Sequence, residues 1–333
     1  MAVIRELIVV RVLALFLALL AAPAFAAGYT SHPAYPAFEA KMVREHGFKA
    51  AELRSLLAQA ERKDSILEAI ARPAEKRLSW GEYRELFITK ARIDGGVAFW
   101  RENKDALADA AKRFGVDPEV VVAIIGVETR YGGNMGSYRV IDALATLSFD
   151  YPPRSAFFGG ELEQFLMMTR EQGFDALQLK GSYAGAMGMG QFIPSSFRAY
   201  AVDFDGDGHA DIWNSRRDAI GSVANYFNRH GWAAGAHVVD RARTVGKVAV
   251  ASMNPGLEPN TRVGDLQALG LSPGEVLPQD ELVLPLMLET DAGPEYWLGR
   301  HNFYVITRYN RSPLYAMAVQ QLSQEILAAF RQP

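Results

Sequence analysis

The stretch DPEVVVAIIGVETRYG, residues 117–132, is a long apolar run that closes with a single carboxylate. Asp117 stands where a helix N-cap is expected, Pro118 suits the first helical position, and Glu119 falls in the first turn. The pair Gly132-Gly133 predicts the end of the helix, because glycine often follows a helix C-terminus. We therefore expect one helix here, with a buried apolar face.

The carboxylate at the end of this run, Glu128, lies three, four and seven positions after apolar residues. At 3.6 residues per turn it shares their buried face. Desolvation raises the pKa of a carboxyl group, and the negative end of the helix dipole raises it further. A carboxyl group of this kind stays protonated near neutral pH and can act as a general acid. The alternative is a helix-end carboxylate that turns to solvent or pairs with Arg130 or Arg139.

The first 26 residues have the features of a secretory signal peptide. Arg5 and Arg11 flank the start of an apolar run, residues 12–20, and Ala24-Phe25-Ala26 is a small-x-small cleavage site. The alternative is a retained membrane anchor, but the run is shorter than the roughly 20 apolar residues of a spanning helix. We expect cleavage after Ala26 and a soluble exported protein.

The 333-residue chain contains no cysteine, which excludes disulfides and a lipid anchor on an N-terminal cysteine. Export without cysteine fits a bacterial periplasm. Removing residues 1–26 takes two arginines and one glutamate from totals of 35 basic and 38 acidic residues, which leaves a net charge of about −4. This charge argues against nucleic-acid or anionic-membrane binding. We expect a monomer.

The mature chain divides into segments that differ in residue composition and in the spacing of apolar residues. Apolar positions spaced three and four apart predict a helical N-terminal subdomain in residues 27–114. Helices alternate with Gly-, Pro- and Asp-rich loops in residues 115–232, which we interpret as the catalytic core. Short Val- and Leu-rich runs between turn residues predict a small β-rich subdomain in residues 233–300.

The C-terminal segment, residues 301–333, is expected to return to the core. Phe303-Tyr304-Val305-Ile306 favours a strand, and Ser312-Pro313 predicts the start of a helix that runs to about Phe330. Tyr309-Asn310 would lie between them, where a phenol and an amide can point into a cleft. The alternative is an ordinary turn asparagine.

A loop of small residues, 181–194, ends in a polar amide. Small side chains let a ligand reach the backbone, and Ser182 and Gln191 could hydrogen-bond hydroxyl or acetamido groups. A phosphate loop is the rival interpretation, but the Gly-Lys-Ser/Thr signature is missing. Close packing of the loop on a helix is the other alternative.

The segment DFDGDGHAD, residues 203–211, matches the start of an EF-hand loop. Carboxylates at its first, third and fifth positions, glycine at the sixth and a backbone carbonyl at the seventh predict a structural calcium ion. The bidentate glutamate expected at position 12 is replaced by Asn214, and Asp218 is the next available carboxylate. A charged, solvated turn is the alternative, although the carboxylates would repel one another without a cation.

Other chemistry-bearing residues give weaker signals. Asp142, Glu161 and Glu163 could supply a second glycosidase carboxylate, but surface positions on helices fit them better. Lone histidines such as His230 and His237 are more often surface or core residues than ligands, and no zinc motif is present.

Five motifs in this order resemble the membrane-bound lytic murein transglycosylase B family. They are GVETRYG at 126–132, AGAMGMGQFIPSS at 184–196, the Asp-rich loop from Asp203, AIGSVANYF at 219–227 and TRYN at 307–310. Their order and spacing match the family from about Tyr35 to Leu327. The absent lipobox cysteine marks this chain as a soluble, periplasmic member.

The resemblance implies a mainly α (α+β) fold with a lysozyme-like helical catalytic core, a helical N-terminal subdomain and a small β-rich subdomain. By matching position Glu128 would be the only catalytic acid and base, and Arg154 a basic residue of the substrate cleft. The family's paired-arginine pattern is broken at Pro153. Further cleft residues would be Ser182, Gln191, Phe192, Tyr226, Tyr309, Asn310 and Tyr315. The structural Ca²⁺ would be bound by Asp203, Asp205, Asp207, the carbonyl of His209 and, after a one-residue insertion, Asp218.

The activity implied is non-hydrolytic cleavage of the β-1,4 bond between N-acetylmuramic acid and N-acetylglucosamine in peptidoglycan, with glycan strands as partners and possible contacts to cell-wall synthesis or hydrolysis proteins. No organic cofactor is expected. One alternative is a hydrolytic muramidase that uses the same acid and a water nucleophile. The other is a non-catalytic, calcium-dependent peptidoglycan-binding protein.

Overall fold

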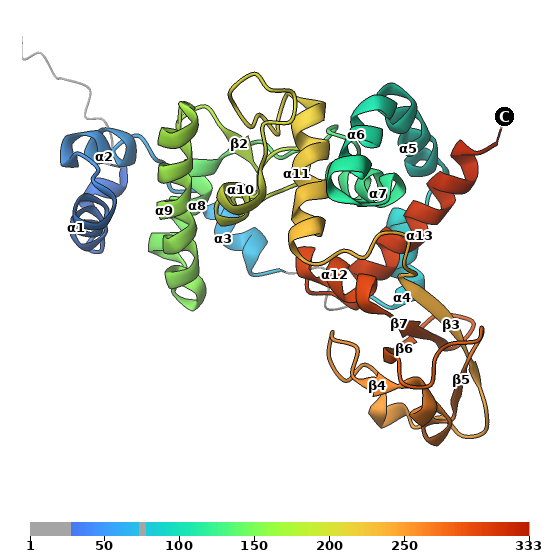
Figure 1. Cartoon of the computed structure of the whole chain (residues 1–333). Helices are drawn as coiled ribbons and strands as arrows, with labels where there is room; N and C mark the ends of the chain where they lie inside the picture. Colours follow the sequence, from blue (N-terminus) through green and yellow to red (C-terminus); the bar gives the residue numbers. More distant parts are fainter. Residues whose placement is uncertain (1–27, 73–77, 333) are drawn as a thin grey trace, which may run out of the picture.

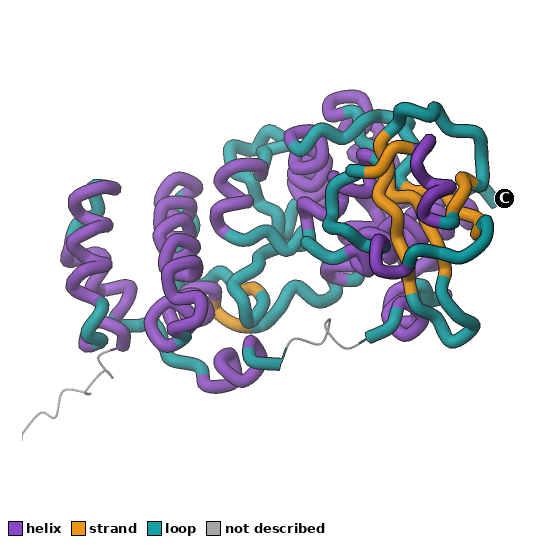
Figure 2. The backbone as a smooth tube through the Cα atoms, turned by 90° about the horizontal axis from the view of Figure 1, so that it is seen from below, coloured by secondary structure: helices purple, strands orange, loops and turns teal. Residues whose placement is uncertain are grey.

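The computed structural model describes residues 28–72 and 78–332, so the expected signal peptide lies outside the described residues. Helices form one elongated body, and the main β-sheet lies at the end opposite helices α1 and α2 (Figures 1 and 2). Among the described residues no helix is both long and apolar enough to span a membrane.

The N-terminal part is helical, as the spacing of its apolar residues predicts. It begins with a short 3-10 turn, Gly28–Ser31. The helices are α1 (Tyr35–His46), α2 (Ala50–Leu57), α3 (Asp64–Ile70), α4 (Trp80–Phe87), α5 (Lys90–Glu102) and α6 (Lys104–Phe114). Helix α3 packs beside α8 (Val140–Asp150), and α4 to α6 pack around α7 (Pro118–Thr129) and the C-terminal helix (Figure 1).

The apolar stretch forms α7, Pro118–Thr129, whose residues 120–127 are all buried. A helix that is apolar on every side belongs inside a core, and α5, α6, α11 (Arg216–Arg229) and α13 (Pro313–Phe330) pack around it. Asp117 occupies the N-cap position but makes no capping bond; its carboxylate accepts a hydrogen bond from the Trp232 indole at 3.0 Å. The prediction that the Asp117 side chain caps the helix is therefore wrong.

The end of α7 also differs from expectation. The helix stops before the glycine pair, because Arg130 and Tyr131 adopt left-handed backbone conformations with φ of 51° and 61°. Their backbone N–H groups donate to the carbonyls of Gly126 and Ile125, which closes the helix with a Schellman-like turn.

The ring of Tyr131 folds back into a slot between two helices. The slot is made by three glycines, Gly95 and Gly96 of α5 and Gly126 of α7. A Cβ atom on Gly126 would lie 2.5 Å from the Tyr131 hydroxyl oxygen, and one on Gly95 would lie 2.9 Å from its ring. The hydroxyl donates to the Arg92 carbonyl at 2.7 Å. The slot thus fixes the turn that follows Glu128.

The rest of the core contains α8 (Val140–Asp150), α9 (Ser155–Gln172), α10 (Pro194–Tyr200) and α11 (Arg216–Arg229). A two-stranded ribbon of β1 (Tyr138–Arg139) and β2 (Lys180–Gly181) lies beside α8, and a 3-10 turn, Pro152–Arg154, joins α8 to α9. The mainly helical, lysozyme-like fold class is confirmed.

The β-rich part is a five-stranded antiparallel sheet with the order β4-β6-β7-β3-β5. Its strands are β3 (Val239–Thr244), β4 (Thr261–Arg262), β5 (Leu271–Pro273), β6 (Leu282–Leu288) and β7 (Glu295–Gly299), with 3-10 turns at Val250–Ser252 and Val263–Leu269. Along β6, Leu284 and Leu286 join the main core while Val283 joins a separate small core. Alternate residues of a strand face opposite sides, so this sheet packs on both faces.

The C-terminal segment corrects one prediction. Phe303-Tyr304-Val305-Ile306 belongs to helix α12, His301–Tyr309, and not to a strand. β-Branched and aromatic residues favour strands only weakly, and here Phe303 and Ile306 share one buried helix face. The following helix, α13 (Pro313–Phe330), starts where Ser312-Pro313 predicts, with the Ser312 hydroxyl accepting the Tyr315 N–H. It crosses α7 and α5.

Candidate active site

Glu128 lies on the last turn of α7 and is only partly buried, unlike the apolar residues before it. The Tyr315 hydroxyl, from the first turn of α13, donates a hydrogen bond of 2.6 Å to its Oε1. Tyr315 itself is 2 % exposed, so its phenol is fixed by packing. The structure thus leaves the carboxyl group partly accessible and orients it with a buried donor.

Two tyrosines lie within electrostatic range of Glu128. Burial raises the pKa of Tyr315 and Tyr309 well above the ordinary value, and the nearby Glu128 charge raises both further. Both phenols therefore stay protonated at any working pH and act only through their hydroxyl hydrogens. The Tyr309 hydroxyl donates to the Gly190 carbonyl and so ties α12 to the small-residue loop.

The small-residue loop lies beside the end of α7. The Thr129 hydroxyl donates to the Met189 carbonyl at 2.9 Å and accepts the Gly132 N–H at 3.0 Å. Gln191 takes a left-handed conformation, φ 52°, and its amide donates to Gly188 O at 3.0 Å and Met135 O at 3.2 Å. The loop is thus closely packed beside the end of α7, and its binding of a ligand stays a prediction.

Ser182 and Asn310 keep hydrogen-bonding capacity. The Ser182 hydroxyl oxygen accepts the Ala186 N–H at 3.1 Å, and no described residue accepts its hydrogen. Asn310 is partly buried at the end of α12, and its side-chain amide has no hydrogen bond within residues 28–72 and 78–332. Both side chains can therefore take substrate hydroxyl or amide groups.

Phe192 and Tyr226 are less available than the sequence suggests. They are 3 % and 7 % exposed, and both rings pack in one aromatic cluster with Tyr309, at centroid distances of 6.0 and 4.7 Å. The Tyr226 hydroxyl donates to the Arg308 carbonyl at 2.6 Å. They shape the wall behind Tyr309 and offer little ring surface for stacking on a sugar.

Arg154 ends the 3-10 turn before α9 and is exposed. Its guanidinium lies 4.5 Å from the ring centre of Phe157, which is itself 41 % exposed. Helices α9 and α7 lie on opposite sides of α11 in Figure 1. The place of Arg154 in a substrate cleft stays a prediction.

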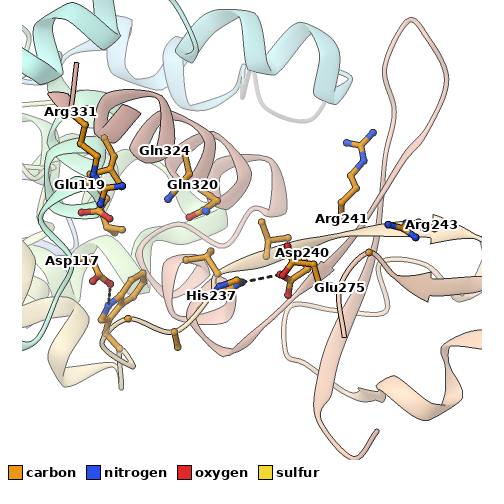
Figure 3. Close-up of a pocket in the computed structure, with 18 residues that line it drawn as sticks. Asp117, Glu119, His237, Asp240, Arg241, Arg243, Glu275, Gln320, Gln324 and Arg331 are labelled. Carbon is orange, nitrogen blue, oxygen red and sulfur yellow. Dashed lines mark hydrogen bonds and ion pairs between the residues drawn. The ribbon is translucent and has the colours of Figure 1, made fainter. Parts of the chain in front are cut away.

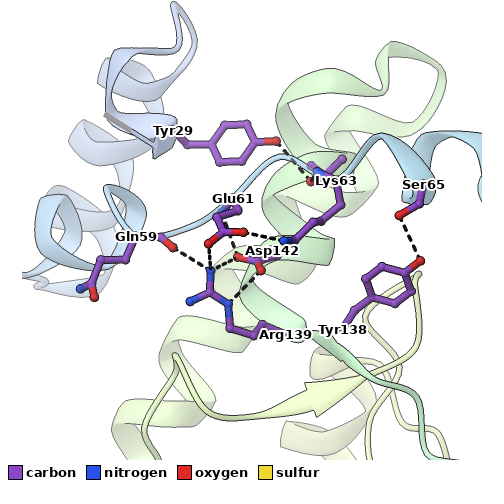
Figure 4. Close-up of polar contacts among 9 residues, drawn as sticks. Tyr29, Gln59, Glu61, Lys63, Ser65, Tyr138, Arg139 and Asp142 are labelled. Carbon is purple, nitrogen blue, oxygen red and sulfur yellow. Dashed lines mark hydrogen bonds and ion pairs between the residues drawn. The ribbon is translucent and has the colours of Figure 1, made fainter. Parts of the chain in front are cut away.

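The three candidates for a second carboxylate all have structural partners. Asp142 is 1 % exposed and accepts two hydrogen bonds from the Arg139 guanidinium, at 2.8 and 2.9 Å, as well as the Glu61 N–H (Figure 4). Glu161, 6 % exposed, accepts the Ser195 N–H and hydroxyl at the start of α10. The prediction that Asp142 and Glu161 lie at the surface is therefore wrong, because both are buried.

The third candidate, Glu163, pairs with Lys41 at 2.6 Å. None of the three is therefore left to activate a water molecule. The contacts of Figure 4 join residues 59–65 to α8 and β1, so Asp142 holds the N-terminal helices on the core.

Sequence reasoning did not identify the residues that fix the end of α7. Thr129 and Tyr131 stand beside Glu128 in the GVETRYG motif, so their proximity was a usable signal. Arg92 gave none: its guanidinium donates to the Gly126 carbonyl from α5, a contact that only the tertiary fold creates.

The Asp-rich loop brings three carboxylates together. Asp203, Asp205 and Asp218 each present an oxygen, all within 4.8 Å of one another. Two oxygens bound to one Ca²⁺ at 2.3–2.6 Å can be no more than about 5 Å apart, so this group fits the ion. Asp218, fully buried, comes from the first turn of α11. Asp207 is outside the group, and its carboxylate accepts the His209 N–H at 2.9 Å.

In this loop, hydrogen bonds lower the pKa of a carboxyl group, whereas burial raises it. The N–H groups of Gly208, Gly206 and Asp207 point at Asp203 and lower its pKa. Burial raises the pKa of Asp218, although its oxygens accept the N–H groups of Phe204 and Asp211 at 2.8 Å. A cation between the carboxylates would favour the charged form of both.

Comparison with known proteins places the chain in a family. Residues 30–324 match the model of the transglycosylase SLT domain. Membrane-bound lytic murein transglycosylase B of Escherichia coli K12 is 45% identical over 310 residues, which cover 90% of this chain and 84% of that protein.

Solved structures agree with this match. Catenated lytic transglycosylase SltB1 of Pseudomonas aeruginosa has a TM-score of 0.87 and 52% identity, covering 91% of this chain and 99% of that one. E. coli Slt35 in complex with calcium has a TM-score of 0.85 and 46% identity, covering 92% and 97%. P. aeruginosa SltB3 in complex with NAG-anhNAM-pentapeptide has a TM-score of 0.77 and 32% identity, covering 89% and 79%. The chain therefore belongs to the transglycosylase SLT domain family, among the relatives of membrane-bound lytic murein transglycosylase B.

Proposed function

We propose that this protein is a lytic transglycosylase that cleaves the β-1,4 bond between N-acetylmuramic acid and N-acetylglucosamine in peptidoglycan and forms a 1,6-anhydromuramyl product. Its family supports the reaction class, and a related enzyme has been solved with an anhydro-muropeptide bound. The observation that carries the proposal is one partly buried carboxyl group, Glu128, oriented by Tyr315, while the three candidate second carboxylates hold other parts of the structure.

The chemistry needs only this one group. Protonated Glu128 gives its proton to the glycosidic oxygen as the bond to C1 breaks, and the acetamido oxygen of the substrate stabilises the cation at C1. The carboxylate then takes the proton from the C6 hydroxyl, whose oxygen attacks C1. Glu128 ends protonated again and no water is consumed, whereas a hydrolase places a second carboxylate to activate water.

Neighbouring residues would position the glycan. Ser182 has a hydroxyl hydrogen and Asn310 an amide that no described residue uses, and both suit the hydroxyl and acetamido groups of a sugar. Ser182 belongs to the small-residue loop, which is joined to the residue after Glu128 by the hydrogen bond from Thr129 to Met189. These contacts support a glycan subsite on the loop side of Glu128.

The mass of the released fragments tests the proposed reaction. The mature chain, incubated with purified sacculi, should release muropeptides with 1,6-anhydro ends, each lighter by one water than a hydrolysis product. Fragments with reducing ends would identify a muramidase, and binding to sacculi without release would identify a binding protein. Either result would overturn the proposal.

We further propose that Asp203, Asp205 and Asp218 bind a structural Ca²⁺ in the mature, periplasmic protein. The convergence of the three carboxylates supports this, as does the calcium complex of a relative with 46% identity. The His209 carbonyl would add a ligand, and Asp207 would contribute only after its side chain turns. The ion would hold the loop against the start of α11 and take no part in proton transfer.

Calcium should therefore raise the thermal stability of the protein. A ligand at 100 times its Kd stabilises the folded state by about 2.7 kcal/mol, so transfer from saturating Ca²⁺ to a chelator should lower the Tm by several degrees. Asp205→Asn should remove most of this response, and Asp280→Asn, at an exposed position of the β-rich part, should preserve it. Equal melting temperatures with and without calcium would contradict the proposed site.

A further inference from the structure

A second cluster of metal-binding side chains lies far from the Asp-rich loop. It borders a cleft of about 830 Å³ between the start of α7, the end of α13 and strand β3 (Figure 3). Three of the lining residues, His237, Asp240 and Glu275, come from the segment before β3, from β3 itself and from the loop after β5. His237 and Asp240 are only three positions apart in the sequence. The fold brings Glu275, which lies 35 positions after Asp240, next to this pair.

The geometry suits a single ion. One ligand atom from each of the three side chains lies within 4.8 Å of the other two, and His237 Nδ1 is 3.1 Å from Asp240 Oδ1. Two ligands of one Zn²⁺, each bound at 2.0–2.2 Å, are at most about 4.4 Å apart. Small side-chain rotations, easy for the exposed His237 and Glu275, would complete the site.

The charges in this cluster are incompletely neutralised. Asp240 is only 7 % exposed, and its contact with the Arg300 guanidinium is 3.4 Å long, whereas Arg300 lies 2.6 Å from Glu281. Glu275 has no ion pair or hydrogen bond among the described residues. Arg241 points away from the cluster in Figure 3 and pairs with Glu295. Two carboxylates thus face one imidazole, and a divalent cation would balance them.

Another side chain in the cleft has an unused polar atom. Gln320 of α13 lines the cleft, and its Oε1 is buried with no hydrogen-bond partner in the described part of the chain. A buried acceptor without a donor costs about 1–3 kcal/mol, so a water molecule or another donor is expected beside it.

We propose that His237, Asp240 and Glu275 bind a divalent transition-metal ion of the Zn²⁺ type, with water in the fourth position. One imidazole and two carboxylates suit zinc, whereas Ca²⁺ takes six to eight oxygens and would favour the Asp-rich loop. The ion would join the connection that follows α11 to both β3 and the loop after β5.

Calorimetric titration of the mature protein with ZnCl₂, in saturating Ca²⁺, tests this site. Wild type should bind one Zn²⁺, and His237→Ala or Glu275→Gln should weaken binding by about tenfold or more, since even changes around a ligand cost 10–100-fold. Glu258→Gln, an exposed carboxylate of the same β-rich part, is the matched control and should bind as wild type does. Neither ligand variant removes a buried side chain, so both should fold.

Anomalous X-ray scattering at the zinc edge gives a direct second measurement. A peak between His237 and Glu275 would support the proposal. A peak at the Asp-rich loop alone, or zinc affinity that is the same in wild type and both variants, would overturn it. Because the readout is metal binding, its failure would leave the proposed transglycosylase activity unaffected, and loss of that activity would leave the zinc result intact.

Discussion

Glu128→Gln is expected to lower kcat on peptidoglycan by about 10⁴-fold or more, because positioned acid or base catalysis contributes 10²–10⁴-fold in one step and Glu128 serves both steps. Glutamine has nearly the same shape and can still accept the hydrogen bond from Tyr315. It can neither give a proton to the leaving oxygen nor take one from the C6 hydroxyl. The rate of anhydro-muropeptide release, measured by mass spectrometry, checks the effect.

Glu163→Gln is the matched control for this experiment. Glu163 is a second helix carboxylate in the catalytic core, but it pairs with Lys41 at 2.6 Å. Its substitution should change kcat by less than about twofold, because a pair of this kind contributes on the order of 1 kcal/mol to folding and nothing to proton transfer. If Glu128→Gln retained more than a few per cent of the wild-type rate, the proton donor would have to be another residue.

Tyr315→Phe is expected to lower kcat by about 10- to 100-fold, since a hydrogen bond to a charged group contributes about 1.5–3 kcal/mol. The 2.6 Å bond from the Tyr315 hydroxyl orients the Glu128 carboxyl group and favours its charged form. Removing the donor therefore raises the pKa of Glu128. The first step needs protonated Glu128, so the alkaline limb of the pH–rate profile should move to higher pH.

The control for this variant is Tyr29→Phe. Tyr29 is also buried, at 4 % exposure, and also donates to a carboxylate, that of Asp150 at 2.7 Å. Losing its hydroxyl should cost stability but leave the pH–rate profile in place. An unshifted profile in Tyr315→Phe would mean that the hydrogen bond only supports packing. A shift towards lower pH would contradict the argument that the Tyr315 hydrogen bond favours the charged form of Glu128.

Much of the fold could be predicted because local signals and tertiary packing agree. The start of α13 at Ser312-Pro313 and the helical pattern before residue 114 are examples. Prediction failed at residues 303–306, where aromatic and β-branched residues suggested a strand but the burial of Phe303 and Ile306 on one face selects a helix. Residue preference is weaker than burial when the two disagree.

The site shows the same division. Glu128 could be identified from its place at the end of an apolar run, but its donor comes from Tyr315, 187 positions later. Asp142 accepts the Glu61 N–H from 81 positions away, and Glu161 accepts the Ser195 hydroxyl from 34 positions away. The absence of a second catalytic carboxylate could therefore be suspected but not argued from residue types. Only the assembled fold shows which carboxylates are already engaged.

The glycine slot around Tyr131 bears on the engineering of heat-resistant variants. Each glycine inside a helix lowers stability by roughly 0.5–1 kcal/mol relative to alanine, so the slot holds the turn after Glu128 in place at the expense of helix stability. Alanine at Gly95, Gly96 or Gly126 would meet Tyr131 or Ile326 at 2.5–2.9 Å. Gly160, inside α9, has no atom within 4 Å of a new Cβ. A design that replaces helix glycines should therefore begin at Gly160 and leave the slot intact.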